Sequence, residues 1–252
     1  MAGSDPPMST DPVIPRAQDQ LFAPGTSARQ KYAALVVGRD GLAALLAYEL
    51  VVTFTQSVPG ALGLLLRKTF YPMLLGSCGR NVVFGQNVVI RHPHKIHIGD
   101  NVVVDDHCLL DAKGSSNDGI RIASGVFIGR NSILSCKNGD IELAAGANIG
   151  FNCEIFSASR VRLGAHALMA AYSYVIGGDH DFTDPSKTIL EQSRTSKGVT
   201  IGDGAWIGAG AKILDGVSIG ESAIIGAGAV VRDDVGPRAV AVGIPARVVS
   251  TR

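Results

Sequence analysis

The sequence has almost no excess charge of either sign, because 23 Lys and Arg residues nearly balance 22 Asp and Glu residues and leave a formal net charge of +1. It also lacks a basic stripe interleaved with aromatic residues, so nothing predicts a nucleic-acid-binding surface. The four cysteines form no CxxC pair, which favours reduced, mostly buried thiols in a cytoplasmic protein. No apolar stretch follows a basic start at the N-terminus, and we expect no signal peptide and a disordered leader over residues 1–28.

What the sequence does contain is a six-residue repeat. A branched aliphatic residue returns at every sixth position near the C-terminus, at Ile201, Ile207, Ile213, Ile219, Ile225 and Val231. A period of six belongs to neither an α-helix nor a simple strand, and it is typical of a parallel β-helix in which three short faces make one turn. We therefore predict an all-β solenoid over residues 76–235, with the aliphatic side chains inside a narrow prism.

The repeat continues upstream with interruptions. Counting one polar face near Ser116, the sequence contains 21 faces, which divide into about seven coils of three. The largest interruption separates Val175 from Ile201, so we predict that a loop over residues 176–198 leaves the solenoid. A loop of this length inside a regular fold is usually functional or disordered, and we expect this one to be functional.

An apolar segment over residues 29–75 precedes the repeat. Residues 50–66 carry no charge, but Pro59 and Gly60 interrupt them, and a spanning helix needs roughly 20 apolar residues. Three interpretations of this helical segment stay open: it caps the open end of the solenoid, it lies at the membrane interface with Arg67 and Lys68 facing lipid headgroups, or it spans the bilayer. The expected location is the cytoplasm, with membrane association as an open alternative.

The predicted loop contains a single histidine, His180, between the carboxylates of Asp179 and Asp181. An imidazole titrates near neutrality and can abstract a proton from a hydroxyl or an amine. A carboxylate on its other ring nitrogen would orient it, and Asp179, Asp181 and Glu154 are the candidates. The alternative is a solvated loop histidine beside acidic neighbours.

The stretch GDGAWIGAGAKILDGVSIGESAIIGAGAVV, followed by AVGIPARVV, resembles the C-terminal coils of the hexapeptide-repeat acyltransferases. This family includes the maltose, galactoside, streptogramin and polysaccharide O-acetyltransferases. Two shorter motifs also match it, one in the loop and one in a coil: Gly178-Asp179-His180-Asp181 and Gly150-Phe151-Asn152. The resemblance covers residues 76–252. It implies a left-handed parallel β-helix, a homotrimer and an acyl-CoA-dependent O-acyltransferase.

The resemblance also implies roles for individual residues. His180 would remove the proton of an acceptor hydroxyl, and Asn152 would orient the acceptor or stabilise the oxyanion, with a polar corner residue as the alternative for Asn152. The closest likeness is to the O-acetyltransferases of sugar and polysaccharide pathways, which implies a small-molecule or glycan acceptor. The candidate substrate contacts are Asp179, Asp181, Glu154 and Asp111.

The co-substrate implied by the resemblance is acetyl-CoA, without a metal, bound in a groove between two prisms of the trimer. A C-terminal tail over residues 236–252 would contact it. The candidate residues are Trp206, Ala209, Ala227, Gly228, Arg232 and Arg247. Trp206 has an alternative role as an anchor of the subunit interface. The lysine that the family has after its last coil is replaced here by Asp233, and Arg232 stands one residue earlier.

Three rival interpretations compete with the acyltransferase. The first is a non-enzymatic hexapeptide scaffold. The second is a γ-type carbonic anhydrase with a histidine-bound zinc, although His92, His94 and His97 lack the spacing between coils that such a site needs. The third is nucleophilic catalysis by Cys153, which has no histidine at local spacing.

Overall fold

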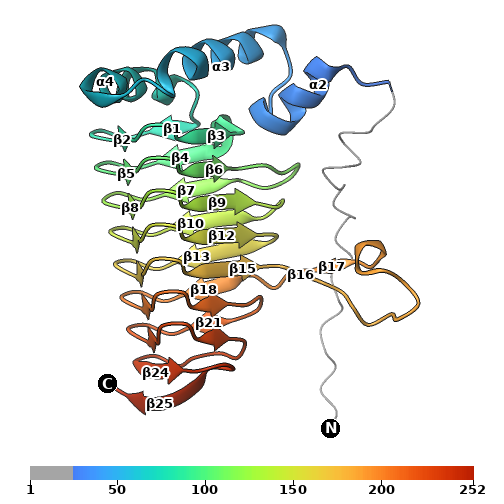
Figure 1. The fold of residues 1–252 in the computed structure, drawn as a ribbon, viewed down its shortest axis with the longest axis vertical. Coiled ribbons are helices and arrows are strands. Elements are labelled where there is room, and N and C mark those ends of the chain that lie inside the picture. The colour runs from blue at the N-terminus through green and yellow to red at the C-terminus, as the bar shows by residue number, and fades with distance from the viewer. Residues whose placement is uncertain (1–24) are drawn as a thin grey trace.

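The computed structural model describes residues 25–252, and most of them wind into a three-sided solenoid of parallel strands (Figure 1). Sheet A contains β1 (Ser77–Cys78), β4 (Ile96–Ile98), β7 (Ile120–Ile122), β10 (Asp140–Leu143), β13 (Arg160–Leu163), β18 (Val199–Ile201) and β21 (Ser218–Ile219). Sheet B contains β2 (Val83–Phe84), β5 (Val103–Val104), β8 (Phe127–Ile128), β11 (Asn148–Ile149), β14 (Leu168–Met169), β19 (Trp206–Ile207), β22 (Ile224–Ile225), β24 (Ala239–Val242) and β25 (Arg247–Thr251). Sheet C contains β3 (Val89–Arg91), β6 (Leu109–Asp111), β9 (Ile133–Cys136), β12 (Glu154–Ser157), β15 (Tyr174–Gly177), β20 (Lys212–Ile213) and β23 (Val230–Val231).

Each coil takes one strand from each sheet, so that β1, β2 and β3 form the first coil and β21, β22 and β23 form the seventh. The predicted solenoid of about seven coils is confirmed, and its geometry is consistent with a left-handed β-helix. After the seventh coil Val235 bridges Ile219, and β24 pairs with β22 in a partial eighth coil. Residues 239–251 therefore extend sheet B beyond the predicted boundary at residue 235.

One predicted face is wrong. Ser116 lies in the loop between β6 and β7, and the additional face comes instead from Cys78 on β1. Lys95 holds this loop outside the prism, because its Nζ donates to Gly114 O at 2.8 Å and to Asn117 O at 3.0 Å. The total of 21 faces is unchanged, and because Ser116 forms no face, Ile122 stacks on Ile98.

Aliphatic side chains at the repeat positions fill the prism. Ile149 and Ile213 are completely buried, and burial of such a side chain contributes roughly 1.5–3 kcal/mol. Small residues such as Ala211 close the corners without any exposed surface. The glycine that follows the aliphatic residue admits the next coil, since an added Cβ at Gly208 would lie only 2.6 Å from Ala227 N.

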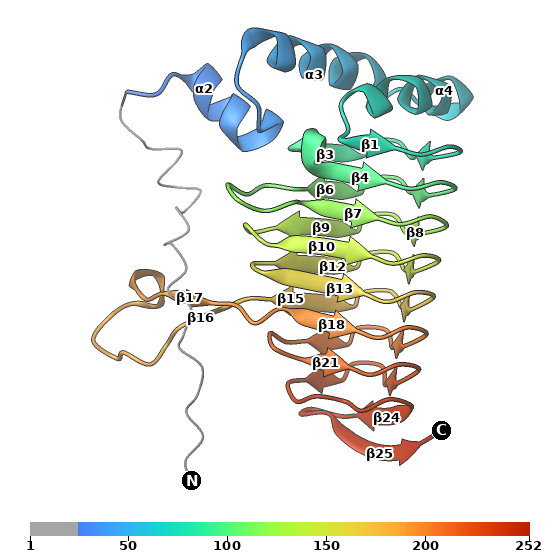
Figure 2. The same ribbon diagram turned by 180° about the vertical axis from the view of Figure 1, so that it is seen from behind.

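The N-terminal helical segment lies across the first coil (Figures 1 and 2). It consists of α2 (Ala28–Tyr32), the π-helix η1 (Ala33–Val37), α3 (Leu42–Thr55), α4 (Gly60–Phe70) and the 3-10 helix η2 (Tyr71–Met73), and a further 3-10 helix, η3 (Pro93–Lys95), connects β3 to β4. Tyr48 Oη donates to Ile90 O at 2.8 Å, and Tyr71 Oη donates to Val88 O at 3.1 Å. These contacts agree with the capping interpretation. Within residues 25–252, no helix combines the length and the apolar character needed to cross a membrane.

Arg67 fastens this cap to the solenoid. Its side chain is only 1% exposed. Nε donates to Phe84 O at 3.0 Å, and Nη1 donates to Thr55 O at 2.9 Å and to Val58 O at 2.8 Å. The interpretation in which Arg67 faces lipid headgroups is therefore wrong. The buried guanidinium satisfies carbonyl groups at and just beyond the end of α3, which would destabilise the fold if they were buried without hydrogen-bond partners.

The predicted loop leaves the solenoid between β15 and β18 and projects far from it (Figures 1 and 2). It contains β16 (Asp179–His180), the 3-10 helix η4 (Ile189–Glu191) and β17 (Arg194–Thr195), and β16 and β17 form an antiparallel hairpin. Gly178 permits the exit, because an added Cβ would lie 2.6 Å from Ala158 Cβ. Ser196 Oγ donates to Gly177 O at 2.9 Å and so ties the two ends of the loop together.

Candidate active site

An open cleft of about 270 Å³ lies where sheet C meets the extruded hairpin. It forms because β9, β12 and β15 are neighbours in sheet C and the hairpin follows β15 directly. The side chains that line it include Lys137, Phe156, Tyr174, Asp179, His180 and Arg194. Two of these, Asp179 and His180, are among the residues predicted from the sequence.

His180 stands half-buried in the hairpin opposite Arg194. Its ring Nδ1 is enclosed, and no hydrogen-bond partner reaches it from residues 25–252. The three predicted orienting carboxylates are engaged differently: Asp179 Oδ1 accepts the backbone N–H of His180 at 2.7 Å, whereas Asp181 bonds within the loop and Glu154 lies beside Tyr174 on sheet C. A single chain therefore places the His180 imidazole in the cleft lining with its enclosed Nδ1 unpartnered within residues 25–252.

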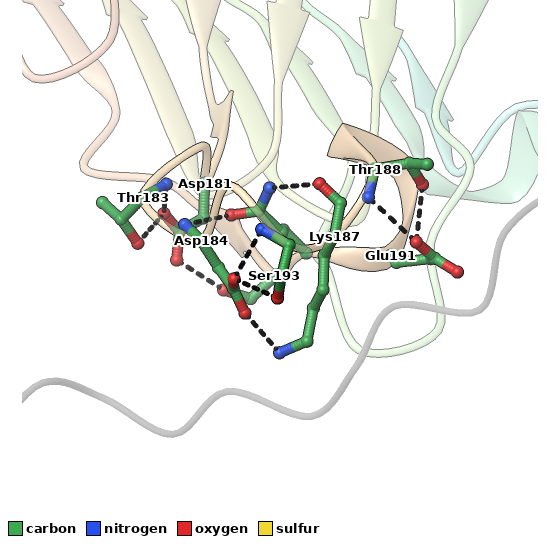
Figure 3. A network of polar contacts seen from close by, with 9 residues as sticks. Asp181, Thr183, Asp184, Lys187, Thr188, Glu191 and Ser193 are labelled. Carbon is green, nitrogen blue, oxygen red and sulfur yellow. Dashed lines mark hydrogen bonds and ion pairs between the residues drawn. The ribbon is translucent and has the colours of Figure 1, made fainter.

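The rest of the loop is held by its own polar contacts (Figure 3). Asp181 Oδ1 accepts from Thr183 N at 2.9 Å and from Thr183 Oγ1 at 2.8 Å, and these hydrogen bonds lower the pKa of the Asp181 carboxyl. Further along, Lys187 Nζ lies 2.9 Å from Asp184 Oδ2. These contacts stabilise turns, so the structure explains Asp181 as a turn residue that positions the hairpin.

The sequence analysis did not predict the four charged or aromatic residues that line the cleft beside Asp179 and His180: Lys137, Phe156, Tyr174 and Arg194. The rings of Phe156 and Tyr174 lie 5.8 Å apart, and Lys137 Nζ lies 5.6 Å from the centre of the Phe156 ring. Burial raises the pKa of Tyr174, and the nearby negative charge of Glu154 adds to this effect. The signal for these residues in the sequence is the coil register, which places β12 and β15 side by side and thereby brings Phe156 near Tyr174.

Asn152 lies outside the cleft lining, at the corner that connects β11 to β12, where its φ is 54°. The same corner position in the other coils also has a positive φ. It is occupied by Asn87, His107, Asn131, Tyr172, Gly210 and Gly228. Left-handed backbone disfavours most L-residues, and asparagine adopts it more readily than they do. The positive φ thus accounts for Asn152 as a corner residue. Asn152 precedes β12 and His180 follows the adjacent β15, so the length of a sheet C strand separates them.

Asp111 also lies away from the cleft. It ends strand β6, and β9 and β12 separate this strand from β15. Asp111 is 8% exposed, its carboxylate lies 3.8 Å from Arg91 Nη1, and the carboxylate accepts the backbone N–H of Lys113 at 3.1 Å. Burial raises the pKa of Asp111, while the positive charge of Arg91 opposes this shift. The site residues that the sequence predicts therefore divide between the cleft and other parts of sheet C.

The residues predicted for acyl-CoA lie on the last coils. At the corner between sheets B and C, the coils after Tyr172 have glycine in the equivalent position, at Gly210 and Gly228. An added Cβ at either glycine would meet no atom within 4 Å, so the corner is open there. Ala209 and Ala227 precede these glycines and are exposed. This edge is therefore smooth and accessible, as an extended ligand lying along the backbone would require.

Trp206 is 48% exposed on β19. It belongs to an outward-facing row along sheet B that also includes Val83, Phe127 and Leu168 and that only the polar Asn148 interrupts. An exposed apolar row of this kind is typical of a protein interface, and it favours the alternative in which Trp206 anchors a subunit contact.

Asp233 joins the two arginines that were predicted to contact phosphate. Its Oδ2 lies 3.1 Å from Arg247 Nη1 and 3.6 Å from Arg232 Nε. All three side chains are more than half exposed. The replacement of the usual lysine by Asp233 thus partly neutralises both cations.

Among the residues of the rival interpretations, Cys153, His92 and His97 have hydrogen-bond partners, whereas His94 Nδ1 is buried without one in residues 25–252. Cys153 is buried, its Sγ lies 3.1 Å from Ala170 O, and burial raises its thiol pKa, which is unfavourable for a nucleophile. His92 Nε2 lies 3.0 Å from Ala34 O, and His97 Nδ1 lies 3.0 Å from Ser77 Oγ. Among residues 25–252, no group of three or more His, Cys, Asp or Glu side chains could hold a metal ion.

Family models and a curated relative agree with the repeat. Residues 198–233 match the bacterial transferase hexapeptide (six repeats), and residues 77–105 match the hexapeptide repeat of succinyl-transferase. Over 133 residues the chain is 30% identical to a probable acetyltransferase of Mycobacterium tuberculosis, a match that covers 53% of this chain and 44% of that protein. The chain thus spans less than half the length of this relative.

Two solved structures show the same fold. Both are point mutants of AntD, an N-acyltransferase from Bacillus cereus, in complex with dTDP and coenzyme A. One is 22% identical with a TM-score of 0.52 and covers 79% of this chain and 92% of that chain, and the other is 24% identical with a TM-score of 0.50 and covers 71% and 85%. These two structures share the β-helix fold with the chain, and the two repeat-model matches confirm its predicted resemblance to hexapeptide-repeat proteins.

Proposed function

We propose that the protein is an acyl-CoA-dependent O-acyltransferase that transfers an acetyl group to a hydroxyl of a sugar, a glycan precursor or a glycosylated natural product. The observation that carries the proposal is the half-buried imidazole of His180 in the lining of a cleft, directly opposite Arg194. An imidazole so placed can accept the proton of a hydroxyl as its oxygen attacks the thioester carbonyl. The tetrahedral intermediate then collapses, and CoA leaves as the thiolate. The similarity to a probable acetyltransferase supports this reaction class.

The proposed enzyme is a homotrimer whose active site uses two chains. The exposed apolar row on sheet B around Trp206 supports an interface between prisms. Asn152 and His180 lie at opposite ends of the sheet C strands, so both can contact one substrate only if they come from different chains.

Acetyl-CoA would lie along the corner between sheets B and C. The exposed Ala209, Ala227 and Gly228 leave room for the pantetheine arm there. Arg232 and Arg247 are the cations that would meet the phosphates, and Asp233 reduces their net charge.

The experiment compares turnover of acetyl-CoA by the wild-type protein and by a His180→Asn variant over a panel of sugar acceptors. Loss of a general base costs typically 10²–10⁴-fold, and folding should be unchanged because the hairpin lies outside the prism. His107→Asn is the matched control, because His107 is an exposed corner residue with φ 59°. Equal rates for the wild-type and His180→Asn proteins would refute the assigned base. Absence of any calorimetric signal with acetyl-CoA or CoA would instead favour the scaffold interpretation.

We further propose that the N-terminal helical segment contacts a membrane surface. A stripe of exposed side chains with a four-residue spacing runs along α3: Leu42, Leu46, Leu50 and Phe54. Leu62, Leu65 and Met73 extend the exposed apolar surface over α4 and η2. Apart from the buried Arg67, the basic residues of this segment outnumber Asp40 and Glu49: they are Arg29, Lys31, Arg39 and Lys68. An exposed apolar face with a basic excess suits a surface of anionic lipid.

A further inference from the structure

We propose that the cleft beside His180 selects an acceptor that carries an acidic group, either a carboxylate or a phosphate, on its sugar ring. This inference rests on the proposed acyl transfer and adds the chemical class of the acceptor. It comes from the four lining residues that the sequence did not reveal. Lys137 and Arg194 are cations, and Phe156 and Tyr174 are aromatic.

The two cations of the cleft form no ion pair, although Lys137 lies near enough to Asp111 for its charge to act on that carboxylate. No ion pair joins Lys137 or Arg194 to a carboxylate anywhere in the described part of the chain, whereas neighbouring Lys187 and Arg160 are both paired. Asp179 is the single carboxylate among the lining residues, and its Oδ1 is already engaged by the backbone N–H of His180 at 2.7 Å. The lining therefore has an excess of positive charge directly beside the proposed base.

The position of the cations relative to the reacting group is set by two rigid features. Arg194 lies directly opposite His180 in the antiparallel hairpin, and both residues line the cleft. Lys137 follows β9, two strands from β15, and lies over the Phe156 ring. An anion held by these cations would thus place the ring that carries it within the cleft and its hydroxyls toward His180.

The aromatic wall supplies the remaining contact. Phe156 and Tyr174 lie side by side on adjacent strands with their rings 5.8 Å apart. Aromatic side chains present large apolar faces, against which the apolar face of a sugar ring packs. Arginine binds carboxylate and phosphate groups in a bidentate manner, and lysine acts as a point charge. The volume of about 270 Å³ suits one substituted ring and not a long chain.

The first test measures binding directly, so that it does not depend on turnover. Glucuronic acid, glucose 6-phosphate and glucose are titrated into the wild-type protein and into Lys137→Gln, Arg194→Gln and the double variant. We expect at least one acidic sugar to bind at least about tenfold more tightly than glucose, and each substitution to weaken this binding by about tenfold or more. The preferred acid distinguishes a carboxylate from a phosphate. Lys187→Gln is the matched control, because Lys187 lies in the same loop outside the cleft lining.

The second test measures acetyl transfer with the same acceptors. The substitutions should raise KM for the acidic acceptor by about tenfold or more, whereas Lys187→Gln should leave this KM unchanged. Equal binding of acidic and neutral sugars, or acid binding that survives in the double variant, would overturn the inference and leave the acyltransferase intact. If the variants lose the binding of acidic sugars but the wild-type protein transfers acetyl to no acceptor, the cleft is an acidic-sugar site and the proposed reaction is refuted.

Discussion

Replacement of Arg67 by methionine should release the helical cap from the solenoid. Methionine keeps the unbranched apolar stem and removes the guanidinium that donates to Phe84 O, Thr55 O and Val58 O. A buried acceptor left without a partner costs about 1–3 kcal/mol. The variant no longer buries a charge, which offsets part of this loss. The net loss of docking free energy should therefore be about 2–4 kcal/mol.

Hydrogen exchange is the appropriate measurement, because a solenoid coil contacts only its neighbours and the cap can open without unfolding the rest. A loss of about 2–4 kcal/mol corresponds to roughly 30- to 900-fold faster exchange of the amides in α3 and α4. Exchange in the distant coils should stay unchanged. Lys68→Met is the matched control, since Lys68 is the exposed neighbour on the same helix. If the exchange rates of Arg67→Met stayed within about threefold of the wild-type rates, the assigned role of Arg67 would be wrong.

Three other perturbations test separate parts of the molecule. Trp206→Glu should shift the trimer to smaller species in light scattering, whereas Ser218→Glu on sheet A should not; identical masses would contradict the sheet B interface. Asp233→Asn should tighten CoA binding by about two- to fivefold at low salt, because exposed ion pairs contribute about 0.2–1 kcal/mol, and unchanged binding would exclude these arginines from the phosphate site. Leu50→Asp should reduce sedimentation with anionic liposomes, and a wild-type protein that does not sediment with them would end the membrane proposal.

The sequence by itself determined the solenoid and the position of its loop. The aliphatic residues from Ile201 to Val231 recur at a period that only stacked short faces can bury, so the repeat specifies the fold locally. The interval between Val175 and Ile201 is too long for one face and must leave the prism. His180 was found for the same reason, because it falls in that interval.

Only the tertiary structure decided which side chains meet. The stacking register depends on the summed length of each coil, so a loop such as that around Ser116 cannot be distinguished from a polar face until Lys95 is seen to bind it. Arg67 resembled a basic flank in the sequence, yet it is buried because carbonyls from α3 and β2 converge on it. Lys137 and Arg194 are more than fifty positions apart and share a cleft because stacking and hairpin pairing superpose them. A six-residue period can be read from a short stretch of the sequence, whereas a binding site depends on pairings between distant residues that no local pattern contains.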